Sequence, residues 1–293
     1  MKVCLYGQKL NKEDLTHIMS FISHLKDHKV EIYVYEPFFE LLPAETGSSF
    51  KDHLWSSHEE LIKIKPNVLI SFGGDGTILS SVHILRDSLI PVLGINMGRL
   101  GFLAGVDKKL SSDAVYQLVH GMYRIEERAM LRLDSNVPLF GNHPVALNDF
   151  TILKRDNSSM ITIKTYLNGD FLNSYWADGL IVATPTGSTG YSLSCGGPIV
   201  FPESNNLVIT PVAPHNLNVR PVVIPDNTVL SFEVEGRTDN FLCTMDSRYE
   251  VITSDYQLAI KRCEYNVRLV HLHPSNFLKT IHDKLNWGLD QRN

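Results

Sequence analysis

The sequence has few cysteines and no long apolar run. Its cysteines, Cys4, Cys195, Cys243 and Cys263, lie far apart and form no C-x-x-C pair. This spacing argues against a structural zinc site and a disulfide framework, and it favours reduced thiols in a reducing compartment. No stretch approaches the roughly 20 apolar residues of a spanning helix, and the first residues do not resemble a signal peptide. We therefore expect a cytoplasmic protein without a membrane segment.

Excess charge is also absent. The formal net charge is −5, whereas nucleic-acid-binding domains normally carry a basic excess, so we expect no nucleic-acid partner. Hydrophobic residues make up 43% and charged residues 20% of the chain, which is ordinary for a globular protein with a buried core. A length of 293 residues is comfortable for two domains.

The first hundred residues alternate strand and helix patterns. Apolar or alternating segments predict strands, and apolar residues at helical spacing predict helices. The strands are expected at 3–6, 30–35, 67–72 and 90–95, and the helices at 15–25, 50–64 and 78–85. Such alternation is typical of a parallel sheet covered by helices, so we predict an N-terminal Rossmann-like α/β domain over residues 1–103.

The second part of the chain is dominated by short strand patterns. After a helix at 113–120, strands are expected at 124–133, 145–153, 160–167, 228–235 and 265–272. Asn168-Gly169 predicts a type I′ hairpin turn. We predict a β-sandwich-like domain over residues 104–274 and a terminal helix, 275–293, that packs back on the first domain. A cleft between two such domains is the natural place for a ligand.

Gly73-Gly74-Asp75-Gly76-Thr77 lies between a predicted strand and a predicted helix. Glycines let the backbone approach a ligand closely, and N–H groups at a helix N-terminus attract phosphates. An acid in such a loop repels phosphate unless it holds Mg²⁺ or takes a proton from an attacking hydroxyl. The loop therefore indicates phosphate binding. The alternative is a tight turn in which Asp75 caps its own helix.

The loop has neither the Gly-Lys-Ser/Thr of a Walker A motif nor the G-x-G-x-x-G of dinucleotide dehydrogenases. Any nucleotide chemistry here must work without a P-loop lysine. A second glycine-rich segment, 94–101, follows the next strand and either lines the same cleft or forms a structural turn.

Residues 177–194, A-D-G-L-I-V-A-T-P-T-G-S-T-G-Y-S-L-S, form the second motif. A buried strand is flanked by Asp178 and by a turn rich in hydroxyls and glycine. Hydroxyls and exposed amides suit ribose, carboxamide and phosphate groups, and Tyr191 offers a flat face for a ring. Composition alone leaves a surface loop as the alternative.

These segments together resemble those of the NAD kinases, in which an acidic-Gly strand runs into T-P-T-G-S-T-A-Y-S. Asn148-Asp149 is similar to the family's Asn-Glu pair, and 214–221 resembles its P-H-x-L-x-x-R-P segment. Asp246-Ser-Arg248 stands where many members carry an acid followed by glutamine. The family order is kept over most of the chain, with Gly190, Asp149 and Arg248 replacing the common Ala, Glu and Gln. Diacylglycerol and sphingosine kinases share the glycine loop without the T-G-S-T segment.

The resemblance implies transfer of the γ-phosphate of ATP to the 2′-hydroxyl of the adenosine ribose of NAD. It also implies Mg²⁺ or another divalent cation with ATP, no resident metal ligands, and a homo-oligomer, either a dimer or a tetramer. Asp75 is the expected general base. The residues expected to bind the nucleotides are Gly73, Gly74, Asp75, Gly76, Thr77, Asn148, Asp149, Asp178, Thr186, Thr189, Gly190, Tyr191, Ser192, Leu193, Ser194 and Arg248.

Two other functions remain open from the sequence. One is an NAD- or NADP-sensing protein without turnover, against which Asp75 argues because a sensor needs no base there. The other is a lipid kinase, which labelled ATP offered with NAD or with diacylglycerol would distinguish.

Overall fold

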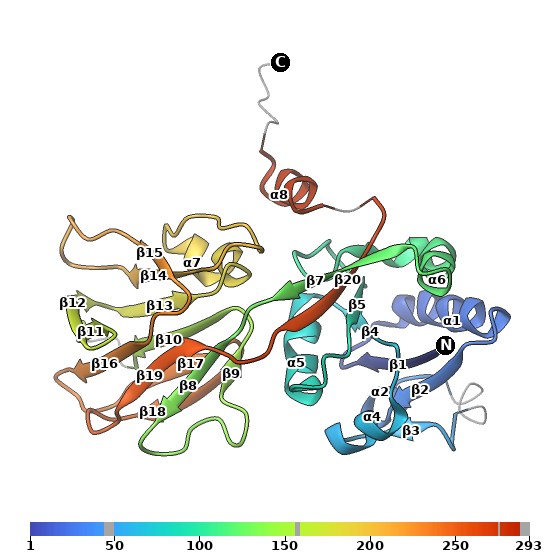
Figure 1. Cartoon of the computed structure of the whole chain (residues 1–293), viewed down its shortest axis with the longest axis horizontal. Coiled ribbons are helices and arrows are strands. Elements are labelled where there is room, and N and C mark those ends of the chain that lie inside the picture. The colour runs from blue at the N-terminus through green and yellow to red at the C-terminus, as the bar shows by residue number, and fades with distance from the viewer. Residues whose placement is uncertain (44–49, 156–158, 275, 288–293) are drawn as a thin grey trace. The chain divides into compact units, whose positions relative to one another are not determined.

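The chain folds into two compact units. The computed structural model describes residues 1–43, 50–155, 159–274 and 276–287. Unit 1 comprises Met1–Glu127 and Val267–Asn293, and unit 2 comprises Arg128–Asn266 (Figure 1). The boundary lies later than the expected 103/104, because the helix and strand that follow pack within unit 1. The last strand, expected in the β domain, likewise joins the sheet of unit 1.

Unit 1 is built on an eight-stranded sheet in the order β3-β2-β1-β4-β5-β20-β7, with β6 paired to β5. The register is parallel from β3 through β20. The strands are β1 (Lys2–Gly7), β2 (Glu31–Tyr35), β3 (Leu54–Trp55), β4 (Val68–Gly73), β5 (Val92–Asn96), β6 (Val106–Asp107), β7 (Tyr123–Arg128) and β20 (Val267–Leu272). The predicted parallel α/β fold is confirmed.

Helices cover both faces of this sheet. They are α1 (Lys12–Asp27), α2 (Glu36–Phe39), α4 (His58–Ile64), α5 (Asp75–Leu85) and α6 (Ser111–Val119), with a 3₁₀ turn η1 (Lys108–Leu110). Helix α8 (Phe277–Leu285) follows β20, and its Phe277 ring lies 6.4 Å from the Phe102 ring. Helices α1 and α6 lie side by side (Figure 1) and pack on the face that carries Val68, Ile70 and Phe72. Helix α5 packs on the opposite face, where the Ile78 side chain meets the backbone of Gly94. Alternation along each strand therefore supplies both layers of core.

The glycine loop lies at the switch point of the sheet. From β1 the chain proceeds outward to β2 and β3 and then returns to β4 on the other side of β1. Because these strands are parallel, β1, β4 and β5 end at the same edge, at Gly7, Gly73 and Asn96. Doubly wound sheets bind ligands outside the carboxyl ends of their strands at this reversal of order. The topology of unit 1 thus brings 73–77 and 97–105 to one edge.

Unit 2 contains two six-stranded antiparallel sheets, in the orders β15-β14-β13-β10-β17-β18 and β12-β11-β16-β19-β8-β9. The first contains β10 (Asp149–Lys154), β13 (Gly179–Ala183), β14 (Asn206–Val212), β15 (Val222–Pro225), β17 (Phe241–Met245) and β18 (Arg248–Ile252). The second contains β8 (Leu131–Ser135), β9 (Val145–Ala146), β11 (Ile161–Leu167), β12 (Asp170–Ala177), β16 (Leu230–Glu235) and β19 (Leu258–Arg262). Between β13 and β14 lie η2 (Gly187–Thr189) and α7 (Tyr191–Ser194).

The two sheets share one hydrophobic core. Phe150 and Ile152 of the first sheet and Ile163 and Phe232 of the second belong to the same buried cluster. The predicted β-sandwich is therefore confirmed. The hairpin at Asn168-Gly169 is also confirmed, since both residues have positive φ, 51° and 93°.

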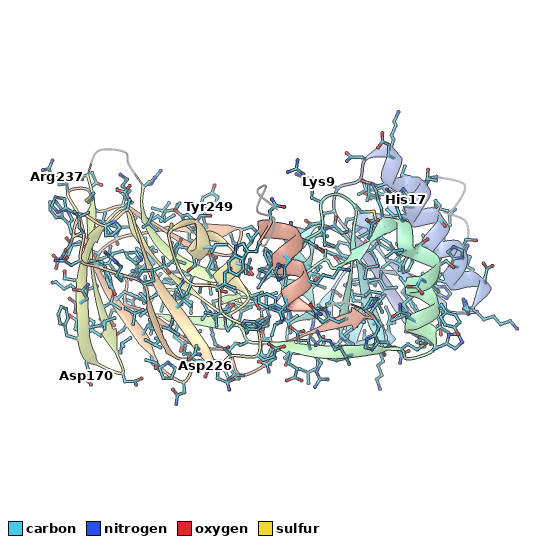
Figure 2. All side chains as sticks on the ribbon, turned by 90° about the horizontal axis from the view of Figure 1, so that it is seen from above. Lys9, His17, Asp170, Asp226, Arg237 and Tyr249 are labelled. Carbon is cyan, nitrogen blue, oxygen red and sulfur yellow. The ribbon has the colours of Figure 1, made fainter. Side chains whose placement is uncertain are left out.

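The antiparallel register is visible in the positions of two labelled side chains. Asp170 begins β12 next to the hairpin turn, whereas Arg237 follows β16 beyond the Thr162–Glu235 pair. Figure 2 shows these two side chains at opposite ends of the strands of unit 2.

Four predicted elements need correction. The helix expected over 50–64 begins only at His58, because Leu54–Trp55 pairs with β2 and Ser57 accepts a hydrogen bond from the N–H of Glu60. The strand expected over 124–133 is two strands, β7 and β8. The strand expected over 145–153 is also two strands, β9 and β10, which belong to different sheets. The terminal helix is shorter than 275–293: α8 covers Phe277–Leu285, and Ser275 and residues 288–293 lie outside the described residues. Within the described residues, no helix combines the length and apolarity needed to cross a membrane.

We predict that Phe72→Ala lowers the free energy of unfolding by about 3–5 kcal/mol, the usual cost of a large cavity. The Phe72 ring is fully buried and packs edge-on against Phe21 (5.4 Å between centroids) and parallel to Phe38 (5.7 Å). Phe72→Leu, which keeps most of the volume, should lose clearly less. Urea unfolding followed by circular dichroism measures both, and two variants as stable as the parent would contradict this packing.

Candidate functional site

The carboxylate of Asp75 is held by a distant part of the chain. Asp75 is the first residue of α5, and the N-cap is Gly74, so Asp75 does not cap its own helix. Its Oδ2 accepts the N–H of Phe102 at 2.8 Å. Its Oδ1 accepts the N–H groups of Leu103 and Ala104 at 3.0 and 2.9 Å. Three consecutive amides therefore fix the direction of this half-buried side chain.

This arrangement leaves Asp75 one acceptor position. A carboxylate has about four lone-pair positions, two on each oxygen. Among the described residues, Oδ1 accepts two hydrogen bonds and Oδ2 accepts one. The remaining position is on Oδ2, and it can accept the proton of an incoming hydroxyl.

Glycines make the close contacts around Asp75 possible. A Cβ at Gly101 would overlap the Asp75 carboxylate, and a Cβ at Gly73 would overlap the Thr77 side chain. The second glycine-rich segment, 94–101, thus forms the turn that brings the following amides, those of 102–104, to Asp75. By contrast, a Cβ at Gly74 or Gly76 would meet no described atom within 4 Å. These two glycines leave the first-turn N–H groups of α5 open to an anion.

In unit 2, the segment 184–200 packs on the outer face of the first sheet. Cys195 and Val200 pack against Ile181, Ala183 and Val208. The N–H of Thr184 donates to the carbonyl of Asn148 at 2.9 Å, and a Cβ at Gly187 would overlap that carbonyl. The structure therefore brings together the Asn148-Asp149 pair and the T-P-T-G-S-T turn, which the sequence separates by more than thirty residues.

Asn148 and Asp149 both point toward Gly190. A Cβ at Gly190 would lie 3.8 Å from Asp149 Oδ2 and 3.9 Å from Asn148 Nδ2, which is ordinary van der Waals contact. The nearest atom to such a Cβ is the Gly187 carbonyl oxygen, at 3.3 Å, so an alanine here would need a small shift of that carbonyl. The polar ends of Asn148 and Asp149 thus lie beside the turn that begins α7.

The predicted residues of the second motif differ in exposure. Thr186 and Ser192 are buried, and the Ser192 hydroxyl bonds the Thr210 hydroxyl at 2.8 Å, which ties α7 to β14. Thr189, Gly190 and Leu193 are half-buried, whereas Tyr191 and Ser194 are exposed. The half-buried and exposed residues of 189–194 can therefore contact a ligand directly, while the buried Thr186 and Ser192 support the turn.

One acid, Asp246, organises the Asn148-Asp149 segment. Its carboxylate accepts the N–H groups of Leu147 and Asn148, both at 2.8 Å, and that of Asp149 at 3.2 Å. Burial raises the pKa of Asp246, and the three N–H donors and Arg248 partly offset this. Burial and the neighbouring Asp246 charge raise the pKa of Asp149 from 3.8 to about 7. Asp149 therefore changes charge near neutral pH.

Two arginines support these elements. Arg128, which is 3% exposed, donates from Nη1 to the Thr186 hydroxyl at 3.3 Å. Arg248 donates to three backbone carbonyls, those of Phe140, His143 and Val145, at 3.3, 3.2 and 2.7 Å. Its guanidinium also lies 5.2 Å from the centre of the Phe140 ring. In this structure the donors of Arg248 thus hold the segment 140–145.

Asp178 lies at the other end of the same strands. Its Oδ1 lies 2.6 Å from Lys154 Nζ. Burial raises the pKa of Tyr191, and the charges of Cys195, Asp149 and Asp178 raise it further.

The two groups of predicted residues belong to different units. Gly73–Thr77 belong to unit 1, and all the other predicted site residues belong to unit 2. Among the described residues, no group of three or more His, Cys, Asp or Glu side chains could hold a metal ion. Mg²⁺ usually keeps several waters and binds through one or two carboxylates plus substrate phosphates.

The sequence did not single out Lys154, Arg128, or the amides of 102–104. The only signal for these amides was the glycine-rich segment before them. Asp246 was noted as an acid, but its bonds depend on a turn with positive φ, 53°, at Asp246 itself.

The comparisons with known proteins agree along the whole chain. Models of the ATP-NAD kinase N-terminal and C-terminal domains match residues 5–123 and 147–272. The chain is 44% identical to an NAD kinase of Cytophaga hutchinsonii and 41% identical to one of Bacteroides fragilis, over 100% of each chain. The structure of yeast NADH kinase complexed with NADH is similar with a TM-score of 0.85, at 22% identity over 99% of this chain and 89% of that one. An Archaeoglobus fulgidus NAD kinase in complex with ATP gives 0.74, at 23% identity over 98% and 99%.

The raised pKa of Asp149 predicts a pH-dependent stability. Below pH 3.8 the acid is protonated in both states, and its contribution to stability is complete. As the pH rises to about 7 the unfolded chain ionises first, so this contribution is lost across that window, at about 1.4 kcal/mol per pKa unit. Asp149→Asn should remove the slope. Urea unfolding of parent and variant between pH 4.5 and 8 measures it, and parallel profiles would contradict the assignment.

Proposed function

The chain belongs to the ATP-NAD kinase family and is an ATP-dependent NAD kinase, and we propose that Asp75 is the general base of its reaction. The reaction transfers the γ-phosphate of ATP to the 2′-hydroxyl of the adenosine ribose of NAD, giving NADP and ADP. Family membership decides against the lipid kinases that share the glycine loop. The observation that supports the base is the Asp75 carboxylate, oriented by three amides with one acceptor position left on Oδ2.

In the proposed step, Asp75 Oδ2 accepts the proton of the 2′-hydroxyl as that oxygen bonds to the γ-phosphorus. The bond from the γ-phosphorus to the bridging oxygen breaks, and ADP leaves with its electron pair. Positioning and charge stabilisation supply most of the catalysis in such transfers. The amides at the start of α5, which Gly74 and Gly76 leave uncovered, are suited to hold phosphate oxygens.

A divalent cation, Mg²⁺ or another, is proposed to enter with ATP. Its ligands would be phosphate oxygens and water. Bound there, the cation would neutralise charge on the phosphates. The chain itself contributes the loop amides and the fixed direction of Asp75.

Unit 2 is proposed to bind NAD. Asn148 and Asp149 would hold ribose hydroxyls, since their polar atoms lie beside Gly190. Asp178 would bind the nicotinamide end, with 189–194 as the wall and Tyr191 as a flat surface. On the pairing β10 with β13, Asp149 lies opposite Ala183 whereas Leu153 lies opposite Gly179. Asp149 and Asp178 are therefore roughly 15 Å apart, a separation suited to the two ends of a dinucleotide.

Arg248 is proposed to act indirectly. Its donors are used by the carbonyls of 140–145, and its charge supports Asp246 beneath the Asn148-Asp149 segment. A cytoplasmic location and a homo-oligomeric state, dimer or tetramer, also remain predictions. Light scattering on the purified protein tests the second.

We expect Asp75→Asn to lower kcat by about 10²–10⁴, the usual contribution of a general base. The asparagine oxygen can still accept the Leu103 and Ala104 amides, but the new NH₂ group cannot accept a proton. NADP formation from NAD, ATP and Mg²⁺, read with an NADP-specific dehydrogenase, measures the loss. Asp27→Asn, at an exposed position on α1, is the matched control and should be unchanged.

Asp75→Ala removes all three amide bonds as well as the base. Comparing it with Asp75→Asn separates loss of the proton acceptor from loss of the held segment. A folded Asp75→Asn enzyme with a near-parental kcat would remove Asp75 from the base role while leaving the kinase activity intact.

A further inference from the structure

Lys154 and Asp178 form an ion pair at the end of the first sheet of unit 2. Lys154 is the last residue of β10, and Asp178 links β12 to β13. The Lys154 Nζ lies 2.6 Å from Asp178 Oδ1, and the backbone N–H of Lys154 donates to the Asp178 carbonyl at 2.9 Å. The Asp178 N–H in turn donates to the Val212 carbonyl at 2.9 Å. Backbone and side-chain contacts thus hold the two charges together.

The pair is neither fully buried nor freely solvated. The side chains of Lys154 and Asp178 are 25% and 32% exposed. At that exposure, charges interact more strongly than in bulk water, and a ligand can still approach the carboxylate. Asp178 directly precedes β13, and Cys195, which follows the proposed wall 189–194, packs on Ile181 of that strand.

We propose that Lys154 sets the preference of this enzyme between the oxidised and the reduced dinucleotide. This inference rests on the proposed role of Asp178 at the nicotinamide end. The oxidised ring carries one positive charge and the reduced ring carries none. A lone Asp178 carboxylate would attract the oxidised ring selectively, whereas the Lys154 ammonium cancels that attraction. Lys154 therefore lets the site accept both redox forms without a large electrostatic bias.

The proposal predicts changes of opposite sign for the two partners. Lys154→Met leaves an unpaired carboxylate, so it should raise the ratio of kcat/KM for NAD to that for NADH by roughly 5-fold, mainly through a lower KM for NAD. Asp178→Asn leaves an unpaired ammonium, so it should lower the same ratio. The double variant removes both charges and should return the ratio toward the parental value.

The experiment measures kcat/KM for NAD and for NADH on the full-length protein with ATP and Mg²⁺. The products NADP and NADPH are separated by chromatography. Lys154→Arg should behave like the parent because it keeps the charge. Lys164→Met is the matched control. Lys164 lies on β11, in the other sheet of unit 2, and its Nζ lies 2.6 Å from Oε1 of Glu235. Lys154→Gln repeats the test should Lys154→Met fold poorly, and the effect should weaken at high salt.

A folded Lys154→Met or Lys154→Gln variant with a parental ratio would overturn the inference, as would equal changes for NAD and NADH. Those results leave the proposed function intact, because the parental protein still makes NADP. A parental protein that phosphorylates neither dinucleotide would instead contradict the proposed function itself.

Discussion

In each unit, one carboxylate that accepts three consecutive backbone N–H groups organises the residues singled out as the site. In unit 1 it is Asp75, bound by the amides of 102–104, and in unit 2 it is Asp246, bound by those of 147–149. Charge-assisted bonds of this kind are about twice as strong as neutral ones, and three of them fix both oxygens. Each acid therefore converts a flexible loop into a segment with one defined conformation.

The two acids differ in their neighbours. Asp75 lies in the glycine loop at the start of α5, where it is proposed to act on a substrate hydroxyl. Asp246 lies beside Asp149 and Arg248, and their charges interact with its own. Its charge raises the pKa of Asp149, which carries a polar group toward Gly190. The same motif of three amides thus orients the proposed general base in one unit and supports the Asn148-Asp149 segment in the other.

Cations then compensate the acids of unit 2 in different ways. Lys154 pairs with Asp178 directly, while Arg248 uses its donors on backbone carbonyls and reaches Asp246 only through its field. The pKa of Asp149 is raised by burial and by the like charge of Asp246. Near the surface proposed for NAD, the charge of Asp178 is therefore paired with Lys154, that of Asp246 is partly offset by Arg248, and Asp149 titrates near neutral pH. A dinucleotide with ionic phosphates and a ring of variable charge would meet a different electrostatic environment at each end.

Features with local causes could be predicted from the sequence. Period and composition were enough for the parallel α/β unit and the β-sandwich, and Asn168-Gly169 was enough for its hairpin, because these depend on neighbouring residues. The motif order was enough for the family. Only the tertiary structure decided that Asp75 binds amides 27–29 residues away, that 265–272 joins the first sheet, that Leu54–Trp55 is a strand, and that Arg248 holds 140–145. Each of these depends on a partner distant in the chain, and neither periodicity nor a single motif specifies which distant groups will meet.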